Sequence, residues 1–273
     1  MFEEWKQARR DIVARYELKY LVPQDVVPEV RRFISHFCLP DPYARGTPPE
    51  YSITTMQLDN IQYALHHAKE RELLNRFKLR VRTYGDIGST PVFTEIKAKF
   101  ENVVHKWRAA IPFEAWHPTL LTEPYIPRIF RSQRQEIDFL RFKRLVRELD
   151  ARPVALVRYV RESHVGKMDR YARVTFDRRL EYQMTDSWTG FGRGGRWRGM
   201  DSATAQDAGL PFSAVVLEVK TLSHPPLWVI DLVERFQLKR SGFCKYSTAI
   251  WREGVFRRWP EMGHLTAEEL ALA

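Results

Sequence analysis

Three short segments of the sequence place a carboxylate two residues before a lysine. They are Glu17-Leu18-Lys19, Glu95-Ile96-Lys97 and Glu218-Val219-Lys220. Residues two apart project to the same side of an extended strand, so each carboxylate shares a face with its lysine. Lysines bind anionic oxygens, and carboxylates hold hard divalent cations such as Mg²⁺ or Mn²⁺ together with phosphate oxygens and water. This pattern points to a polyanionic substrate bound together with a metal.

Other basic residues repeat the two-residue spacing along the chain. They are Lys78, Arg80 and Arg82; Lys97 and Lys99; Lys106 and Arg108; and, in separate segments, Arg161 and Arg173. For a single strand, the ordinary interpretation of such a face is that it is solvated. The repetition favours another interpretation, in which the sheet closes into a barrel with the charged face inward. Only a strongly anionic ligand would then offset the mutual repulsion of the cations.

These residues need strands to position them, and period-two alternation supplies the expected positions. The predicted strands are residues 15–22, 51–59, 75–84, 92–100, 103–111, 155–163, 172–177 and 214–221. Apolar residues recur at helical spacing in residues 28–37, 133–149 and 227–238. Short predicted turns at residues 85–90 and 101–102 indicate antiparallel neighbours. Residues 186–212 are rich in glycine and lack periodicity, which predicts a long loop.

The fold class expected from this pattern is α+β, with an antiparallel β-barrel flanked by helices and residues 1–273 forming one domain. The 44 Lys and Arg residues exceed the 34 Asp and Glu residues, and the net charge of +10 favours an anionic partner. Cys38 and Cys244 lack the spacing of a zinc site or a disulfide framework. No apolar stretch approaches the roughly 20 residues of a membrane span, and the first residues do not resemble a signal peptide. We therefore expect a cytoplasmic protein.

The sequence also resembles a known family. The segments RYELKYLV, YSITTMQLDN, FKLRVRTYG, FTEIKAKF, VVHKWRAAI, VRYVRESHV, ARVTFDRRLEY, VVLEVKT and FCKYSTAI are similar, in the same order, to motifs of the VTC domain of polyphosphate polymerases. This family lies within the CYTH-like superfamily of triphosphate tunnel metalloenzymes. The resemblance implies a barrel that holds a triphosphate in its interior.

The resemblance also implies roles for individual residues. Those expected to hold and activate the reacting phosphates are Lys19, Arg80, Arg82, Arg161 and Arg173. Further phosphate-binding residues are Lys97 and Lys245, with Ser247 assisting, and strand parity adds Lys99, Lys106 and Lys220. Glu218 is expected to ligate Mn²⁺ or Mg²⁺. The hydrolase branch of the superfamily begins with Glu-x-Glu-x-Lys, whereas Arg15 stands at the first Glu position here, which favours the polymerase branch.

The expected activity is transfer of the terminal phosphate of ATP to inorganic polyphosphate, with ATP and polyphosphate or pyrophosphate as partners and without nucleic acid. A triphosphate tunnel hydrolase, acting on inorganic or organic triphosphate, is one alternative. A non-catalytic binder of polyphosphate or RNA is another. RNA readers usually combine basic residues with exposed aromatic residues on the same strand face, whereas the charged faces here carry few aromatic residues apart from Phe93 and Tyr159, which weakens the RNA alternative. Trp188 and Trp197 in the glycine-rich loop fit either base stacking or ordinary packing.

Overall fold

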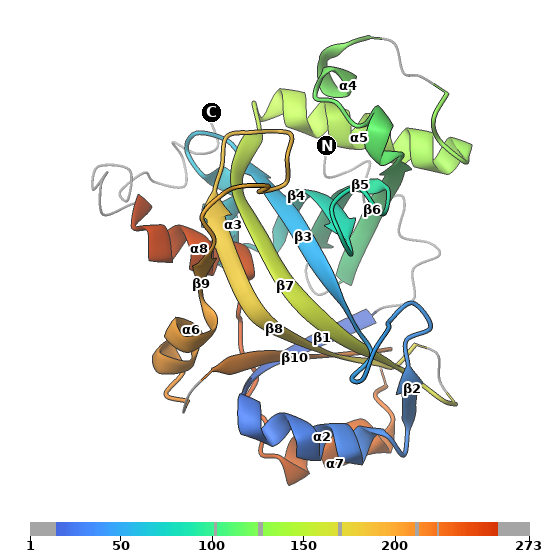
Figure 1. The fold of residues 1–273 in the computed structure, drawn as a ribbon, viewed down its shortest axis with the longest axis vertical. Coiled ribbons are helices and arrows are strands. Elements are labelled where there is room, and N and C mark those ends of the chain that lie inside the picture. Colours follow the sequence, from blue (N-terminus) through green and yellow to red (C-terminus); the bar gives the residue numbers. More distant parts are fainter. Residues whose placement is uncertain are drawn as a thin grey trace.

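The computed structural model describes residues 15–100, 103–124, 128–168, 171–210, 213–222 and 224–255 (Figure 1). These residues form one ten-stranded sheet with helices on its outer side. The strands are β1 (Arg15–Pro23), β2 (Cys38–Pro40), β3 (Glu50–Asp59), β4 (Asn75–Tyr84), β5 (Val92–Phe100), β6 (Val103–Ile111), β7 (Arg152–Gly166), β8 (Arg173–Met184), β9 (Arg198–Gly199) and β10 (Ala214–Leu222). The predicted antiparallel sheet with flanking helices is confirmed.

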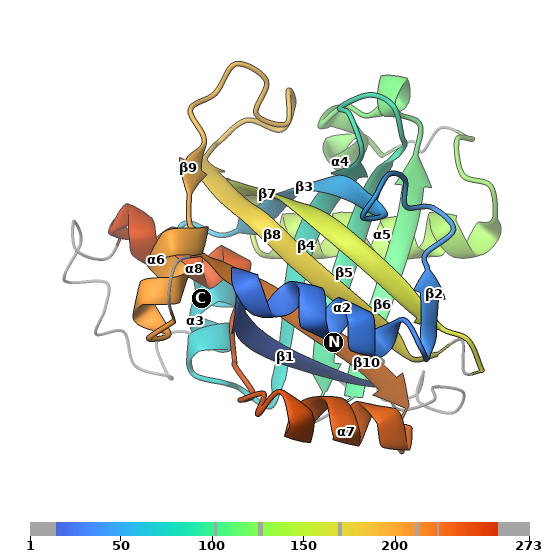
Figure 2. The same ribbon diagram turned by 60° about the horizontal axis from the view of Figure 1, so that its bottom comes forward.

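The main path through the sheet runs β1-β10-β8-β7-β3-β4-β5-β6, and every ladder along it is antiparallel. β2 adds to the outside of β7, and β9 adds to β8. The sheet bends strongly, so that β1 and β10 lie across from β4 and β5 (Figures 1 and 2). Strands that are far apart along the path therefore face one another across a common interior.

The expected closure of the barrel is not complete. Within the described residues, the path of ladders ends at β1 on one side and at β6 on the other. The outer edge of β1 is instead covered by the chain that leads into the last helix. The backbones of Tyr20 and Arg240 form an isolated antiparallel β-bridge, and the amide of Ser241 donates to the carbonyl of Lys19 at 2.8 Å. The predicted turn at residues 101 and 102 lies outside the described residues.

Apolar side chains cover the outer face of the sheet, where helices pack. The helices are α2 (Val27–Ile34), α3 (Ala64–Glu70), α4 (Thr119–Thr122), α5 (Gln133–Glu148), α6 (Asp201–Asp207), α7 (Leu227–Arg235) and α8 (Lys245–Glu253). Phe139 and Phe142 of α5 pack against β4, β5 and β6, while Ile34 of α2 and Leu232 of α7 pack against β1, β8 and β10. Because the apolar face of the sheet packs against the helices on the outside, the charged face points into the interior of the bent sheet.

The structure corrects the expectation of a structureless loop at residues 186–212. The described part of this segment contains β9 and α6, and the Asp201 carboxylate accepts a hydrogen bond from the amide of Leu180 on β8. Trp197 packs beneath the Arg158 guanidinium at 4.1 Å, and a Cβ at Gly192 would lie 2.5 Å from the Trp197 ring. This segment is therefore packed, and its tryptophans are part of the packing. None of the described helices has the length and apolarity needed to cross a membrane.

Candidate active site in the charged interior

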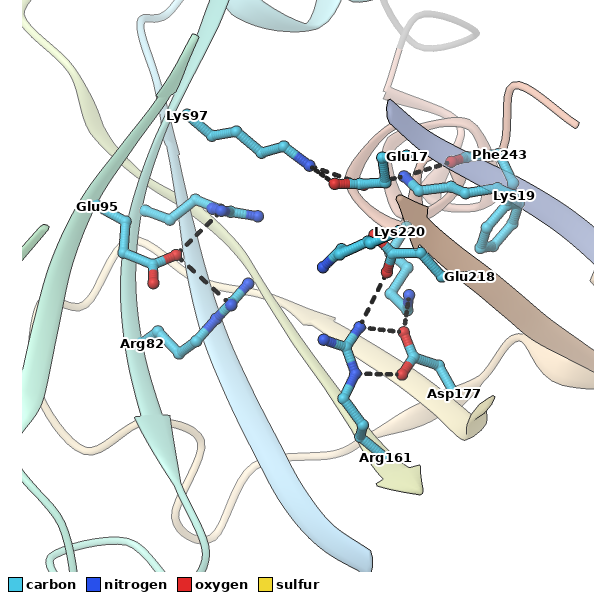
Figure 3. Close-up of polar contacts among 12 residues, drawn as sticks. Glu17, Lys19, Arg82, Glu95, Lys97, Arg161, Asp177, Glu218, Lys220 and Phe243 are labelled. Carbon is cyan, nitrogen blue, oxygen red and sulfur yellow. Dashed lines mark hydrogen bonds and ion pairs between the residues drawn. The ribbon is translucent and has the colours of Figure 1, made fainter. Parts of the chain in front are cut away.

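The charged side chains that were predicted from their alternation along each strand share one face of the sheet. The registers show this, because charged positions on one strand pair with charged or polar positions on the next. Arg80 of β4 is paired with Gln57 on one side and Glu95 on the other. Lys97 is paired with Lys106 on β6, and Glu218 of β10 with Lys19 on β1. Figure 3 shows side chains of β4 and β5 on one side of the interior and those of β1 and β10 on the other.

Glu95 is the centre of the first group of charges. Its side chain is completely buried and lies 3.0 Å from Arg80, 3.5 Å from Arg82, 2.7 Å from Lys106 and 3.5 Å from Arg108. Burial opposes its ionisation, but Arg82, Arg80 and Lys106 outweigh burial and hold the pKa of Glu95 well below its usual value. A single carboxylate thus fixes the positions of four cations.

Burial raises the pKa of a carboxylate but lowers the pKa of a lysine, because it disfavours the charged form of each. It lowers the pKa of Lys106 to about 7, although Glu95 favours the charged form. Lys97 behaves in the same way, with burial lowering its pKa to about 8 against the attraction of Glu17. Both lysines therefore change charge close to neutral pH, and a bound anion would favour their charged forms.

Asp177 is the centre of the second group. It receives two hydrogen bonds from Arg161, at 2.6 and 2.7 Å, and one from Lys245 at 2.6 Å. Burial opposes its ionisation, but Arg161 and Lys245 lower the pKa of Asp177 below its ordinary value. Arg161 also reaches Glu218 at 3.3 Å. Lys245 begins α8, so this carboxylate joins the helix to the β7–β8 part of the sheet.

Glu17 and Glu218 belong to the third group, on β1 and β10. Glu17 lies 2.7 Å from Lys97 across the interior and 3.5 Å from Lys19, while Glu218 lies 3.2 Å from Lys220. Burial opposes ionisation of Glu17, but Lys97, Lys220 and Lys19 hold its pKa well below the usual value. Glu17 is the register partner of Lys220, and Glu218 is the register partner of Lys19, so the two glutamates stand diagonally on adjacent strands. The two glutamates are therefore neighbours.

This pair of carboxylates fits a hard divalent cation. Mg²⁺ and Mn²⁺ are commonly bound by one or two protein carboxylates, with phosphate oxygens and water completing the shell. Among the described residues, no group of three or more His, Cys, Asp or Glu side chains is arranged to hold a metal. Glu218, with Glu17 beside it, would supply the protein ligands. The sequence analysis assigned the metal to Glu218 and not to Glu17, because the position of Glu17 beside Glu218 appears only when β1 pairs with β10.

Three of the predicted residues lie apart from these groups. Arg173 is exposed at the start of β8, opposite Lys220. Lys99 lies near Arg76 and Arg240, and burial followed by the charge of Arg76 lowers its pKa. Ser247 is buried on α8, and its hydroxyl has no hydrogen-bond partner among the described residues. Strand parity places Arg173 and Lys99 on the interior face, but nearer its ends.

The interior also contains a lysine–thiol pair that was not predicted as part of the site. The Nζ of Lys78 on β4 lies 2.8 Å from the Sγ of Cys244, the residue preceding α8. Burial raises the thiol pKa, but Lys78 and the amide of Ser247 outweigh it, so that the pKa of Cys244 falls to about 6. The apolar residues around Cys244 in the sequence gave no sign of this contact.

Comparison with known proteins identifies the family. The chain belongs to the VTC domain family, whose model matches residues 14–252. Among solved structures, the chain is similar to the PH1819 protein from Pyrococcus horikoshii OT3, with 10% identity, a TM-score of 0.41 and coverage of 87% of this chain and 99% of that chain. It is also similar to a mimivirus capping enzyme triphosphatase, with 8% identity, a TM-score of 0.31 and coverage of 87% and 94%. No curated protein sequence gave a match.

Membership of the VTC domain family supports a polyphosphate-related function, performed by phosphoryl transfer and dependent in general on a divalent metal. The charged interior agrees with this class of chemistry, in which positive charge around phosphate oxygens supplies most of the catalysis.

Proposed function

We propose that this protein transfers the terminal phosphoryl group of ATP to a growing inorganic polyphosphate chain. The observation that carries the proposal is the excess of basic side chains in the interior, where, among the described residues, ten basic side chains meet four carboxylates. The cations are Lys19, Lys78, Arg80, Arg82, Lys97, Lys106, Arg108, Arg161, Lys220 and Lys245, and the carboxylates are Glu17, Glu95, Asp177 and Glu218. A triphosphate or a polyphosphate supplies the missing negative charge.

The buried carboxylates hold the basic side chains in fixed orientations, so that these side chains do more than attract an anionic substrate. Glu95 orients Arg80 and Arg82, and Asp177 orients Arg161 and Lys245, before any substrate arrives. Cations that are already oriented stabilise charge that develops on phosphate oxygens without further reorganisation. In this proposal Arg80, Arg82 and Arg161 hold the triphosphate of ATP in line with the acceptor phosphate.

In the reaction, an oxygen of the acceptor phosphate bonds to the terminal phosphorus of ATP, and the bond from that phosphorus to the bridging oxygen breaks. ADP leaves with the bonding electrons, and the chain grows by one phosphate. The acceptor is already an anion near neutral pH, so no strong general base is needed. A divalent metal held by Glu218, with Glu17 beside it, would neutralise phosphate charge.

The proximity of Glu17 to Glu218 also suits a triphosphate hydrolase, whose branch of the superfamily carries a glutamate at the Glu17 position. The same cations would then hold inorganic or organic triphosphate, with water as the acceptor. A polymerase and a hydrolase differ in their products, so product length separates them.

The test is gel analysis of products after the purified protein is incubated with ATP and Mn²⁺ or Mg²⁺. We expect polyphosphate chains and ADP from the wild type and from the surface control Arg144→Gln, but not from Arg161→Gln. Arg144 is a suitable control because it lies on α5 with its side chain 57% exposed. Orthophosphate as the sole phosphate product would establish the hydrolase instead, and binding of ATP without turnover would establish a binder.

A further inference from the structure

Aromatic side chains gather at one end of the charged face. Tyr51 is at the start of β3, Tyr84 at the end of β4 and Phe93 at the start of β5, and all three are partly exposed. The ring centroids of Tyr51 and Tyr84 are 6.0 Å apart, and those of Tyr84 and Phe93 are 5.5 Å apart with nearly perpendicular planes. These residues, together called the ring cluster, follow the parity of the charged side chains on their strands.

The ring cluster is continuous with the cations of the proposed phosphate site. The Arg108 guanidinium lies 3.6 Å from the centroid of Phe93 and 5.3 Å from that of Tyr84. Arg82 lies two residues before Tyr84 on β4 and therefore shares its face of the sheet. On the other side, Tyr51 is the register partner of Arg161. A ligand whose phosphates contact Arg82 and Arg161 would have its remaining atoms close to these rings.

Hydrogen bonds fix the strand ends that carry the rings. The amide of Tyr84 donates to Thr90 Oγ1 at 3.1 Å, and Thr90 Oγ1 donates back to the carbonyl of Tyr84 at 2.9 Å. The amide of Gly85 donates to the carbonyl of Ser52, and the Ser52 hydroxyl donates to the carbonyl of Gly85, both at 2.9 Å. The end of β4 is thereby tied both to its own turn and to β3. Rings on a fixed backbone lose little freedom when a flat ligand packs against them.

We propose that the ring cluster is the subsite for the base of a purine nucleoside triphosphate, with the adjacent arginines holding its phosphates. This inference rests on the proposed function and names the part of the substrate that the charged residues do not recognise. Aromatic rings and guanidinium groups stack on any base, and a purine covers more ring surface than a pyrimidine. Along β4 the order from the rings is Tyr84, Arg82, Arg80 and Lys78. The nucleoside therefore occupies the Tyr84 end, and the acceptor phosphates approach from the Lys78 end.

The test compares a nucleotide with inorganic triphosphate, which supplies the phosphates without the nucleoside. The affinities of the imido analogue of ATP and of inorganic triphosphate are measured by calorimetry, at one Mg²⁺ concentration and one ionic strength, for wild type, Tyr84→Leu and Tyr84→Phe. Tyr16→Leu is the matched control, because Tyr16 has the opposite parity on β1 and is 43% exposed. We expect Tyr84→Leu to bind the nucleotide about tenfold more weakly and to bind triphosphate within about twofold of wild type. Tyr84→Phe, which keeps the ring, should bind both ligands nearly as wild type does.

Other results would overturn the inference. If Tyr84→Leu binds both ligands equally weakly, the ring only supports the arginines; if it binds both normally, the ring does not contact the base. A purine nucleotide that binds no more tightly than a pyrimidine nucleotide would contradict the purine preference. Wild-type protein that binds neither ligand would instead refute the proposed function, and the subsite with it. Thermal unfolding of each variant shows whether a loss of affinity reflects a loss of folding.

Discussion

Lys245 follows Asp177 by 68 residues in the chain, yet its Nζ lies 2.6 Å from the Asp177 carboxylate that also binds Arg161. This contact connects the start of α8 to the interior of the sheet. It brings a cation from a helix into a site otherwise built from strands. The carboxylate is completely buried, so both cations depend on it for charge compensation when no substrate is bound.

Asp177→Asn is expected to lower the free energy of unfolding by about 3 kcal/mol, because it leaves two largely buried cations without their carboxylate. Added inorganic triphosphate should restore much of this loss, since its oxygens replace the missing charge. Denaturant unfolding with and without triphosphate measures both effects. Asp150→Asn is the control, because its partner Arg152 is an exposed residue and the pair contributes little. Equal stability of Asp177→Asn and wild type would contradict the expected dependence.

Glu218→Gln should lower metal-dependent turnover of ATP by at least about two orders of magnitude while nucleotide binding persists. The amide keeps the shape of the side chain but loses the charge that retains Mn²⁺ or Mg²⁺. Turnover is measured against metal concentration, alongside nucleotide affinity. Glu17→Gln should instead shift the required metal concentration upward, and the exposed Glu148→Gln should change neither quantity. Normal metal-dependent turnover in Glu218→Gln would mean that the residue only separates its basic neighbours, Arg161 and Lys220.

Binding of triphosphate should be accompanied by proton uptake near neutral pH. Burial lowers the pKa of Lys106 to about 7 and that of Lys97 to about 8, so in the free protein both lose charge as the pH rises through these values. A bound anion favours the protonated forms, so affinity should fall by up to about tenfold per pH unit for each proton taken up. Calorimetry in buffers of different ionisation enthalpy measures the uptake. Lys106→Arg, which stays charged, should take up fewer protons; an unchanged value would contradict the assignment.

Cys244 should react with a thiol reagent as a thiolate at lower pH than Cys38. The pKa of Cys244 is lowered to about 6 because Lys78 outweighs burial, whereas burial raises the pKa of Cys38 to about 11. The alkylation rate of the Cys38→Ser variant, followed against pH, reports Cys244 alone. Adding Lys78→Met should move its midpoint upward by at least about one pH unit. A midpoint that is indifferent to Lys78 would show that the Lys78–Cys244 contact does not set the thiol pKa.

Much of this site was predictable from the sequence, because strand parity assigns side chains to faces without any knowledge of the fold. Lys19, Arg80 and Lys97 were expected on one face for that reason, and the registers agree. What parity does not reveal is which residues meet across the interior. The contacts of Asp177 with Lys245 and of Glu17 with Lys97 depend on how strongly the sheet bends, and this is a property of the whole fold.

The same limit applies to the residues that were missed. Cys244 was not expected in the site, and its contact with Lys78, a residue already expected on the charged face, joins parts of the chain that are far apart in sequence. The short helix α6 lies in a glycine-rich segment whose composition indicates a loop, and it is held there partly by the contact of Asp201 with β8. The aromatic residues Tyr51 and Tyr84 satisfied the parity rule, but they were not counted with the charged face. Their importance became visible only beside Arg108.

β1 and β6 are not joined by a strand ladder within the described residues, and this affects how a bound phosphate polymer could enter or leave the interior. A fully hydrogen-bonded barrel encloses a polymer so that it can only slide out through an end. Here the described residues of β1 and β6 form no ladder with each other, and Lys97 of β5 meets Glu17 of β1 through side chains at 2.7 Å. Rotation of side chains takes far less time than unpairing a strand. In the proposed polymerase, a growing chain would therefore meet side chains, and no strand ladder of the described residues, on the β1–β6 side of the interior.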